Sequence, residues 1–227
     1  MTISAVIWDL GGVLLRTEDM TSRQALADRM GMPREELEDM VFDNESGDRA
    51  QLGEISVDEH WENIRQQMGL DAAGISEFRR QFWDGDRLDV ELVDYIRSLR
   101  GRYKTGLLSN AFSDLREVVT TLLNFADAFD DMVISAEVHL MKPDPRIYQY
   151  ALQRLGAAPQ EAVFIDDIRQ NVEGARSQGM QAIHFRADSD KAGQLTVQPP
   201  DALQASLGQL QRGDFSPPDQ LRCLNQA

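Results

Sequence analysis

Short apolar runs that alternate with helical patterns constrain the fold of this chain more than any other feature. The runs are rich in aliphatic and β-branched residues, and the first closes at a turn signal, as a buried strand does. They cover residues 3–8, 104–109, 132–135, 162–165 and 181–185, with helical patterns over 92–99, 114–124, 145–155 and 172–178. Strands joined by such helices form a parallel sheet covered on both faces, so we expect an α/β fold with a doubly wound parallel sheet.

A helical block interrupts this alternation. Apolar residues recur at three- and four-residue spacing over 22–31, 34–43, 57–68 and 75–83, and Ser56 with Glu59 forms a capping box that begins the third pattern. Aromatic residues of the block are predicted to pack its own core, and the polar stretch 43–48 is predicted to be a loop. The expected domains are an α/β core (1–15 and 89–200), an inserted helical cap (16–88), and a C-terminal helix with its tail (201–227).

Composition excludes several classes of function. The net charge is −15 and no basic run is present, which argues against a nucleic-acid partner because phosphate contact needs clustered Lys and Arg. No apolar stretch approaches the roughly 20 residues that span a bilayer, and the N-terminus has no signal-peptide pattern, so no membrane partner is expected. Cys223 is the single cysteine, which favours a reducing, cytoplasmic location. Nothing in the sequence predicts the oligomeric state.

Polar residues follow the predicted strands at the edge of the sheet where ligands bind in such folds. In chain order they are Asp9, Ser109, Asn110, Lys142, Asp166 and Asp167. Asp9 and Asp167 can share a divalent cation, because hard cations take oxygen ligands. Lys142 supplies positive charge for phosphoryl oxygens, and Ser109 supplies a hydrogen-bond donor. The sequence therefore predicts a site for a metal ion and a phosphate at this edge.

Four stretches of the sequence, in this order, resemble the motifs of the haloacid dehalogenase superfamily. They read VIWDLGGVL, LLSNA, LMKPDPRIYQ and FIDDIRQNVEGA. The resemblance covers 1–15 and about 90–185, and the helical block lies where many members insert a cap. The chain is most similar to the branch that contains glucose-1-phosphate phosphatases and the N-terminal phosphatase domain of soluble epoxide hydrolases. This resemblance implies a Rossmann-like core with a helical cap whose movement opens and closes the site.

The resemblance also implies a metal site and a nucleophile. Asp9 is similar to the residue that takes the phosphoryl group as an aspartyl-phosphate, a covalent route that divides one difficult step into two. Asp9, the backbone carbonyl of Gly11, and Asp167 correspond to direct metal ligands. Asp166 corresponds to a metal-site residue that acts from the outer coordination shell.

The remaining motif residues imply a substrate site. Ser109 and Lys142 are similar to phosphoryl-binding residues, with Lys142 also part of the catalytic machinery, and Asn110 lies beside the substrate. The implied activity is Mg²⁺-dependent hydrolysis of a small phosphorylated metabolite, and sugar phosphates are the expected class.

Gly11 departs from the pattern of most phosphatases in the superfamily, which have Asp there to protonate the leaving group and then activate water. Members that attack carbon lack this Asp too, so carbon-centred dehalogenation is one alternative. A catalytically impaired phosphate- or protein-binding module is another. The glycine recurs in the branch that the chain most resembles, which favours a phosphatase. A backbone angle that only glycine tolerates is a further reason for Gly11.

Each candidate residue also has a simpler interpretation when it is taken singly. Asp9 would be a turn residue, Ser109 and Asn110 would cap the next helix, Lys142 would be a solvated loop lysine, and Asp166 would be a surface acid. Their convergence at one sheet edge favours the functional interpretation.

Overall fold

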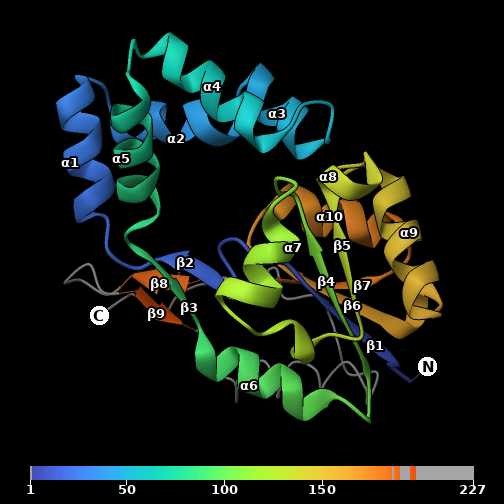
Figure 1. Ribbon diagram of the computed structural model, residues 1–227. Helices are drawn as coiled ribbons and strands as arrows, with labels where there is room; N and C mark the ends of the chain where they lie inside the picture. The colour runs from blue at the N-terminus through green and yellow to red at the C-terminus, as the bar shows by residue number, and fades with distance from the viewer. Residues whose placement is uncertain (1, 186, 190–194, 198–227) are drawn as a thin grey trace, which may run out of the picture.

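A five-stranded parallel sheet forms the centre of the computed structural model, which describes residues 2–185, 187–189 and 195–197. The strands lie in the order β5 (Asp131–Ile134), β4 (Lys104–Ser109), β1 (Ala5–Trp8), β6 (Ala162–Asp166) and β7 (Gln181–His184), and every neighbouring pair is parallel. The expected doubly wound sheet is therefore confirmed (Figure 1). The first strand of the chain lies at the centre of the sheet.

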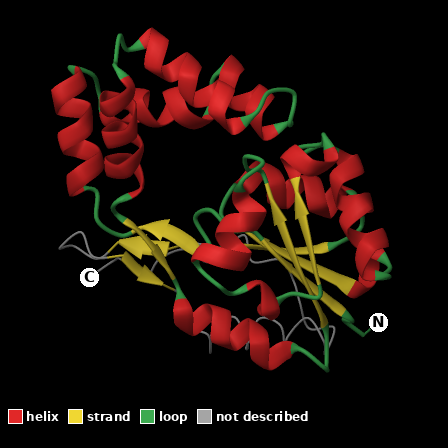
Figure 2. Ribbon diagram, viewed as in Figure 1, coloured by secondary structure: helices red, strands yellow, loops and turns green. Residues whose placement is uncertain are grey.

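Helices cover both faces of this sheet (Figure 2). Val6 and Trp8 point into one apolar cluster, which includes residues of α6 (Val90–Leu99). Ala5 and Ile7 point into the opposite cluster with α9 (Pro145–Leu155) and α10 (Arg169–Ser177). Because successive strand residues face opposite sides, a strand with two covered faces must be apolar throughout.

Short helical elements complete the core. After β4, α7 (Leu115–Glu117) continues into a π-helical turn, η1 (Val118–Leu122), and a 3₁₀ turn, η2 (Ala126–Ala128), precedes β5. The helix expected over 114–124 is therefore α-helical only at its start. The strand expected over 132–135 ends one residue earlier, because Ser135 begins α8 (Ser135–Val138).

A second 3₁₀ turn, η3 (Pro159–Glu161), leads into β6, and β8 (Ala187–Ser189) pairs antiparallel with β9 (Leu195–Val197). The helix expected over 201–211 and the tail lie outside the described residues.

The block between the first two core strands is helical, as expected. It contains α1 (Thr21–Met30), α2 (Arg34–Phe42), α3 (Glu45–Gln51), α4 (Val57–Gln67) and α5 (Ala72–Trp83). Both hydrogen bonds of the Ser56–Glu59 capping box are present. The loop predicted over 43–48 is wrong, because Asn44 accepts a hydrogen bond from the Gly47 N–H and begins α3. An amide that caps a helix has the same sequence signature as one in a turn.

A two-stranded ribbon joins the helical block to the core. β2 (Leu15–Thr17) pairs antiparallel with β3 (Asp86–Leu88), and the predicted domain boundaries fall at this ribbon (Figure 1). The sequence did not predict these strands, since each is only three residues long and contains charged residues. None of the helices among the described residues is both long enough and apolar enough to cross a membrane.

The helical block also contacts the core away from the ribbon. His139 Nδ1 lies 2.8 Å from the Leu52 carbonyl oxygen, and a Cβ on Gly53 would lie only 2.1 Å from the Ala136 carbonyl oxygen. Phe112, from the core segment that follows β4, packs into the apolar cluster of the cap, with its ring stacked on Phe42 at 6.3 Å. The turn at Gly53 therefore fits against the core without space for a side chain.

Replacing Gly53 with Ala is expected to lower the free energy of unfolding more than the same change at Gly31. Both glycines have positive φ, +68° and +70°, but a Cβ on Gly31 would meet nothing within 4 Å. Gly31→Ala therefore reports the backbone cost alone, about 1–2 kcal/mol, and Gly53→Ala adds the clash with Ala136. Urea unfolding of both variants measures the difference. Equal losses would show that the cap does not rest on the core at this turn.

Candidate active site

Three adjacent strands deliver the polar residues of the site to one edge of the sheet. Asp9 directly follows β1, Ser109 ends β4, and Asp166 ends β6, and these strands are neighbours. The Asp9 N–H donates to the carbonyl of Ile165, which holds the end of β1 in register with β6. Residues that lie far apart in the sequence thus meet at the carboxyl ends of parallel strands, as the sequence predicted.

Lys142 lies buried between two of the acids. Its Nζ is 2.8 Å from Asp9 Oδ1 and 2.7 Å from Asp166 Oδ2. The exposed fractions of the three residues are 4%, 5% and 0% in the order Lys142, Asp9, Asp166. The simpler interpretations of Lys142 as a solvated lysine and of Asp166 as a surface acid are therefore wrong.

The side-chain amide of Asn110 fixes the backbone of Lys142. Asn110 Oδ1 accepts from the Lys142 N–H at 2.8 Å, and Asn110 Nδ2 donates to the Lys142 carbonyl at 2.9 Å. Neither Ser109 nor Asn110 caps a helix, since the next helix begins after Asp114. Asn110 also lines the cleft described below, as expected for a residue beside a substrate, but its amide is already hydrogen-bonded to the protein.

The two consecutive acids differ in how far their oxygens are hydrogen-bonded. Asp166 Oδ1 accepts from the Ile168 N–H at 2.7 Å, and Asn171 Nδ2 lies 3.2 and 3.1 Å from its two oxygens. With Lys142 on Oδ2, both oxygens of Asp166 have protein partners. Asp167 Oδ1 is buried and has no hydrogen-bond partner among the described residues. Asp167 is therefore the acid with an oxygen left for a ligand.

The second glycine after Asp9, rather than the first, is sterically constrained. Gly12 has φ +71°, and a Cβ there would lie 2.0 Å from Asp167 Oδ2. Gly11 has no positive φ, and a Cβ on it would meet nothing within 4 Å. The expected glycine-only angle at Gly11 is therefore wrong. The sequence pattern did not single out Gly12, although two consecutive glycines after an acid indicate a close backbone approach.

The site has more negative charge than its one lysine can balance. Burial raises the pKa of Asp9 to about 7, against the opposing effect of Lys142, and burial raises the pKa of Asp167 to about 6. Burial disfavours the charged form of Lys142, but Asp9 and Asp166 together hold the pKa of Lys142 above its ordinary value. Each acid offers one oxygen in a group whose atoms all lie within 4.8 Å of one another. An all-oxygen group with excess negative charge fits a hard divalent cation.

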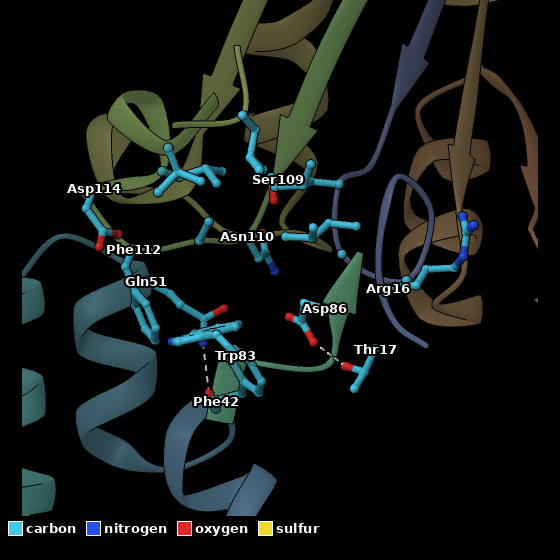
Figure 3. Close-up of a pocket in the computed structure, with 18 of the residues that line it drawn as sticks. Arg16, Thr17, Phe42, Gln51, Trp83, Asp86, Ser109, Asn110, Phe112 and Asp114 are labelled. Carbon is cyan, nitrogen blue, oxygen red and sulfur yellow. Dashed lines mark hydrogen bonds between the residues drawn. The ribbon is translucent and has the colours of Figure 1, made fainter. Parts of the chain in front are cut away.

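A cleft of about 1080 Å³ opens from these residues between the core and the helical block. Gly11, Gly12, Ser109 and Asp167 line its inner end. Figure 3 shows Ser109 and Asn110 on one side of this space, with Trp83 and Phe42 of the cap opposite. The Ser109 hydroxyl makes no hydrogen bond within the described part of the chain, so it is available to a ligand.

Comparison with known proteins gives one matching family model and several relatives. The model for haloacid dehalogenase-like hydrolases matches residues 3–179. A sesquiterpene phosphatase, astK, from Aspergillus oryzae is 27% identical over 81% of this chain and 90% of its own length. A phosphorylated carbohydrates phosphatase from Thermotoga maritima is 27% identical over 80% and 84%. The crystal structure of the Bacteroides thetaiotaomicron enzyme bt-2542, in complex with magnesium and inorganic phosphate, shares the fold with a TM-score of 0.69 and 24% identity, over 84% of this chain and 98% of that one.

The unequal bonding of the two acids predicts unequal effects on cation binding. Asp166→Asn is expected to weaken Mg²⁺ binding by about 10- to 100-fold, as is typical of a residue that acts through other groups. Asp167→Asn should weaken it further, because that change removes the oxygen without a protein partner. Calorimetric titration of each variant with Mg²⁺ measures this, with the exposed Asp94→Asn as the control. The reverse ranking would make Asp166 the direct ligand.

Proposed function

The chain belongs to the haloacid dehalogenase-like hydrolases, and from this premise we propose that it is a Mg²⁺-dependent phosphatase of small phosphate monoesters. The observation that supports this best is the contact of Lys142 with Asp9 and Asp166 beside the unpartnered oxygen of Asp167. Phosphoryl transfer requires little beyond a positioned nucleophile and balanced charge. The arrangement supplies the nucleophile, and a bound divalent cation would balance its excess negative charge.

Asp9 is the proposed nucleophile. Lys142 Nζ and the Leu10 N–H, at 2.8 and 2.7 Å, both contact Asp9 Oδ1, which fixes the orientation of the carboxylate. In the first step a carboxylate oxygen of Asp9 attacks phosphorus, the bond from phosphorus to the alcohol oxygen breaks, and the alcohol leaves as an alkoxide that takes a proton from water. In the second step water attacks the aspartyl-phosphate, which releases inorganic phosphate and restores Asp9.

Mg²⁺ is the proposed cofactor, with Asp9, Asp167 and the Gly11 carbonyl as its ligands. When bound, Mg²⁺ neutralises and orients the phosphoryl oxygens. Asp166 holds Lys142 and acts on the cation from the outer shell. The excess of three carboxylates over one ammonium supports this assignment.

Ser109 and Lys142 are the proposed phosphoryl-binding residues. The free hydroxyl of Ser109 lines the inner end of the cleft and can donate to a phosphoryl oxygen. Asn110 is proposed as a positioning residue, because its amide holds the Lys142 backbone at the edge of the cleft.

The substrate class is open between two kinds of alcohol. The sequence favours sugar phosphates, and the name of the Thermotoga maritima relative supports this. The name of the Aspergillus oryzae relative supports an apolar alcohol instead. Carbon-centred dehalogenation is less well supported, because that reaction needs no metal and this chain has an acid cluster suited to one.

Asp9→Asn is expected to reduce turnover to background and to leave the fold intact. The amide is nearly isosteric with the acid but is a poor nucleophile and a weaker metal ligand. Release of phosphate from p-nitrophenyl phosphate with Mg²⁺, and its loss in EDTA, measures the activity, while circular dichroism checks the fold. Asp94→Asn, on the exposed surface of α6, is the matched control. More than a small residual fraction of wild-type turnover in Asp9→Asn would contradict the covalent route, and an inactive wild type would favour the binding-module alternative.

Gly11→Asp is expected to make the reaction less dependent on the acidity of the leaving group. An acid at this position can protonate the departing alkoxide, a role typically worth about 10²–10⁴ in rate. The variant should fold, because a Cβ on Gly11 would meet nothing within 4 Å. A series of phosphate esters with graded leaving-group acidity measures the slope for both proteins. A shallow slope in the wild type would mean that another residue already acts as the acid.

A further inference from the structure

The cleft beside the site has an apolar wall that extends well beyond the phosphoryl-binding residues. On the core side, Leu115, Val118 and Leu122 follow one another along α7 and η1 and all line the cleft. On the cap side, Met20, Phe42 and Trp83 also line the cleft. We call these six residues the apolar wall. It lies on both sides of the space that Ser109 closes at its inner end.

Part of the apolar wall is exposed to solvent. The exposed fractions are 72% for Leu122, 41% for Met20 and 36% for Trp83, which makes them three of the large hydrophobic residues that the described surface leaves open. Scattered exposed apolar residues need no explanation, but a group of them inside one cleft indicates a ligand that covers them.

Most polar side chains that line the cleft are already bonded to the protein. Arg16 pairs with Asp89, Arg23 pairs with Glu38 and Asp86, and Arg80 pairs with Glu77. The Thr17 hydroxyl donates to Asp86, and Gln51 Nε2 donates to the Phe42 carbonyl. Binding a sugar would require free donors and acceptors at the positions of its hydroxyl groups, because each unpaired polar group that is buried costs affinity.

Beyond Ser109 and Asp167 at the inner end, the exceptions are Arg79 and Asp114, which lie near one another in the cleft. The Arg79 guanidinium lies 5.0 Å from the centre of the Trp61 ring, and no ion pair of Arg79 occurs among the described residues. Burial raises the pKa of Asp114, and the charge of Arg79 opposes this rise, so the two groups lie close enough to interact. One such pair can bind a single polar group of a ligand, whereas a sugar presents several hydroxyl groups.

We propose that the substrate is the phosphate ester of an elongated apolar alcohol, whose hydrocarbon portion lies along the apolar wall while its phosphoryl group lies at Ser109 and Asp9. This inference rests on the proposed phosphatase function and names its substrate class. A cleft of about 1080 Å³ is far larger than a phosphate needs, and clefts of this size hold an organic molecule with some 70–90% of its surface buried.

A series of n-alkyl phosphates tests the proposal, since lengthening a primary alcohol beyond butanol leaves its acidity unchanged. The value of kcat/KM is expected to rise by about two- to fourfold for each methylene that becomes buried, from butyl to decyl phosphate, measured below the concentration at which the esters form micelles. Glucose 6-phosphate, also a primary ester, should react no faster than butyl phosphate. A flat series, or a preference for the sugar ester, would overturn the proposal while leaving the phosphatase function in place.

Variants of the apolar wall test whether the dependence on chain length arises from this surface or from the hydrophobicity of the substrate in general. Leu122→Gln is expected to lower the ratio of kcat/KM for decyl phosphate to that for butyl phosphate by at least threefold. The fold should be kept, because Leu122 is exposed. Val90→Gln is the matched control, since Val90 is 58% exposed on α6 and does not line the cleft, and its ratio should equal that of the wild type. Equal ratios in all three proteins would contradict the assignment of the wall.

Binding experiments decide the question if the chain hydrolyses none of these esters. In that case the phosphatase function is wrong, and calorimetry with alkyl phosphonates of the same chain lengths still tests the wall. Affinity that rises with chain length, with a negative heat-capacity change, would support an apolar ligand. Affinity that does not depend on chain length would overturn the proposal of an apolar ligand. A dimer that Leu122→Gln dissociates would instead assign the apolar wall to a second copy of the chain.

Discussion

The buried ammonium of Lys142 determines how the acids of this site can be arranged. Removing charged groups from water is costly, and an ion pair offsets that cost only where the remaining lone pairs also find partners. Asp166 has such partners on both oxygens, but Asp9 is hydrogen-bonded on Oδ1, and Asp167 Oδ1 has none among the described residues. The fold therefore provides hydrogen-bond partners for both oxygens of Asp166 but leaves Asp9 and Asp167 without enough nearby positive charge. A divalent cation is the ligand that this imbalance favours.

The fold and the site edge were largely predictable from the sequence, because a parallel strand covered on both faces is a continuous apolar run that ends at polar residues. That rule predicts from the sequence alone that Asp9, Ser109 and Asp166 lie at one edge, as the strand order confirms. It could not rank the two consecutive acids by their hydrogen bonds, because the ranking depends on the path of the Lys142 loop, which Asn110 holds through two long-range hydrogen bonds.

Three features of the structure could not be predicted from the sequence, each for a different physical reason. The helix Glu45–Gln51 has no apolar periodicity, and its cap, Asn44, is equally typical of a turn. The ribbon strands are too short for any period to develop, so only their pairing defines them. The constraint at Gly12 arises from its contact with Asp167, 155 positions later in the chain, and adjacent glycines do not reveal which one has positive φ.

Binding energy from the apolar wall can compensate for the missing acid at position 11. In the proposed phosphatase reaction a simple alkoxide is a poor leaving group, and an acid at that position would typically contribute about 10²–10⁴ in rate. Binding energy from a remote part of the substrate raises kcat/KM when it is retained in the transition state. At about threefold per buried methylene, about six methylenes along the wall give about 700-fold, which lies within that range. The phosphate ester of a long apolar alcohol would thus regain much of the rate that is lost without an acid at position 11, whereas a short alkyl ester would not. Since the wall belongs partly to the cap and partly to the core, this recovery depends on the cap lying against the core.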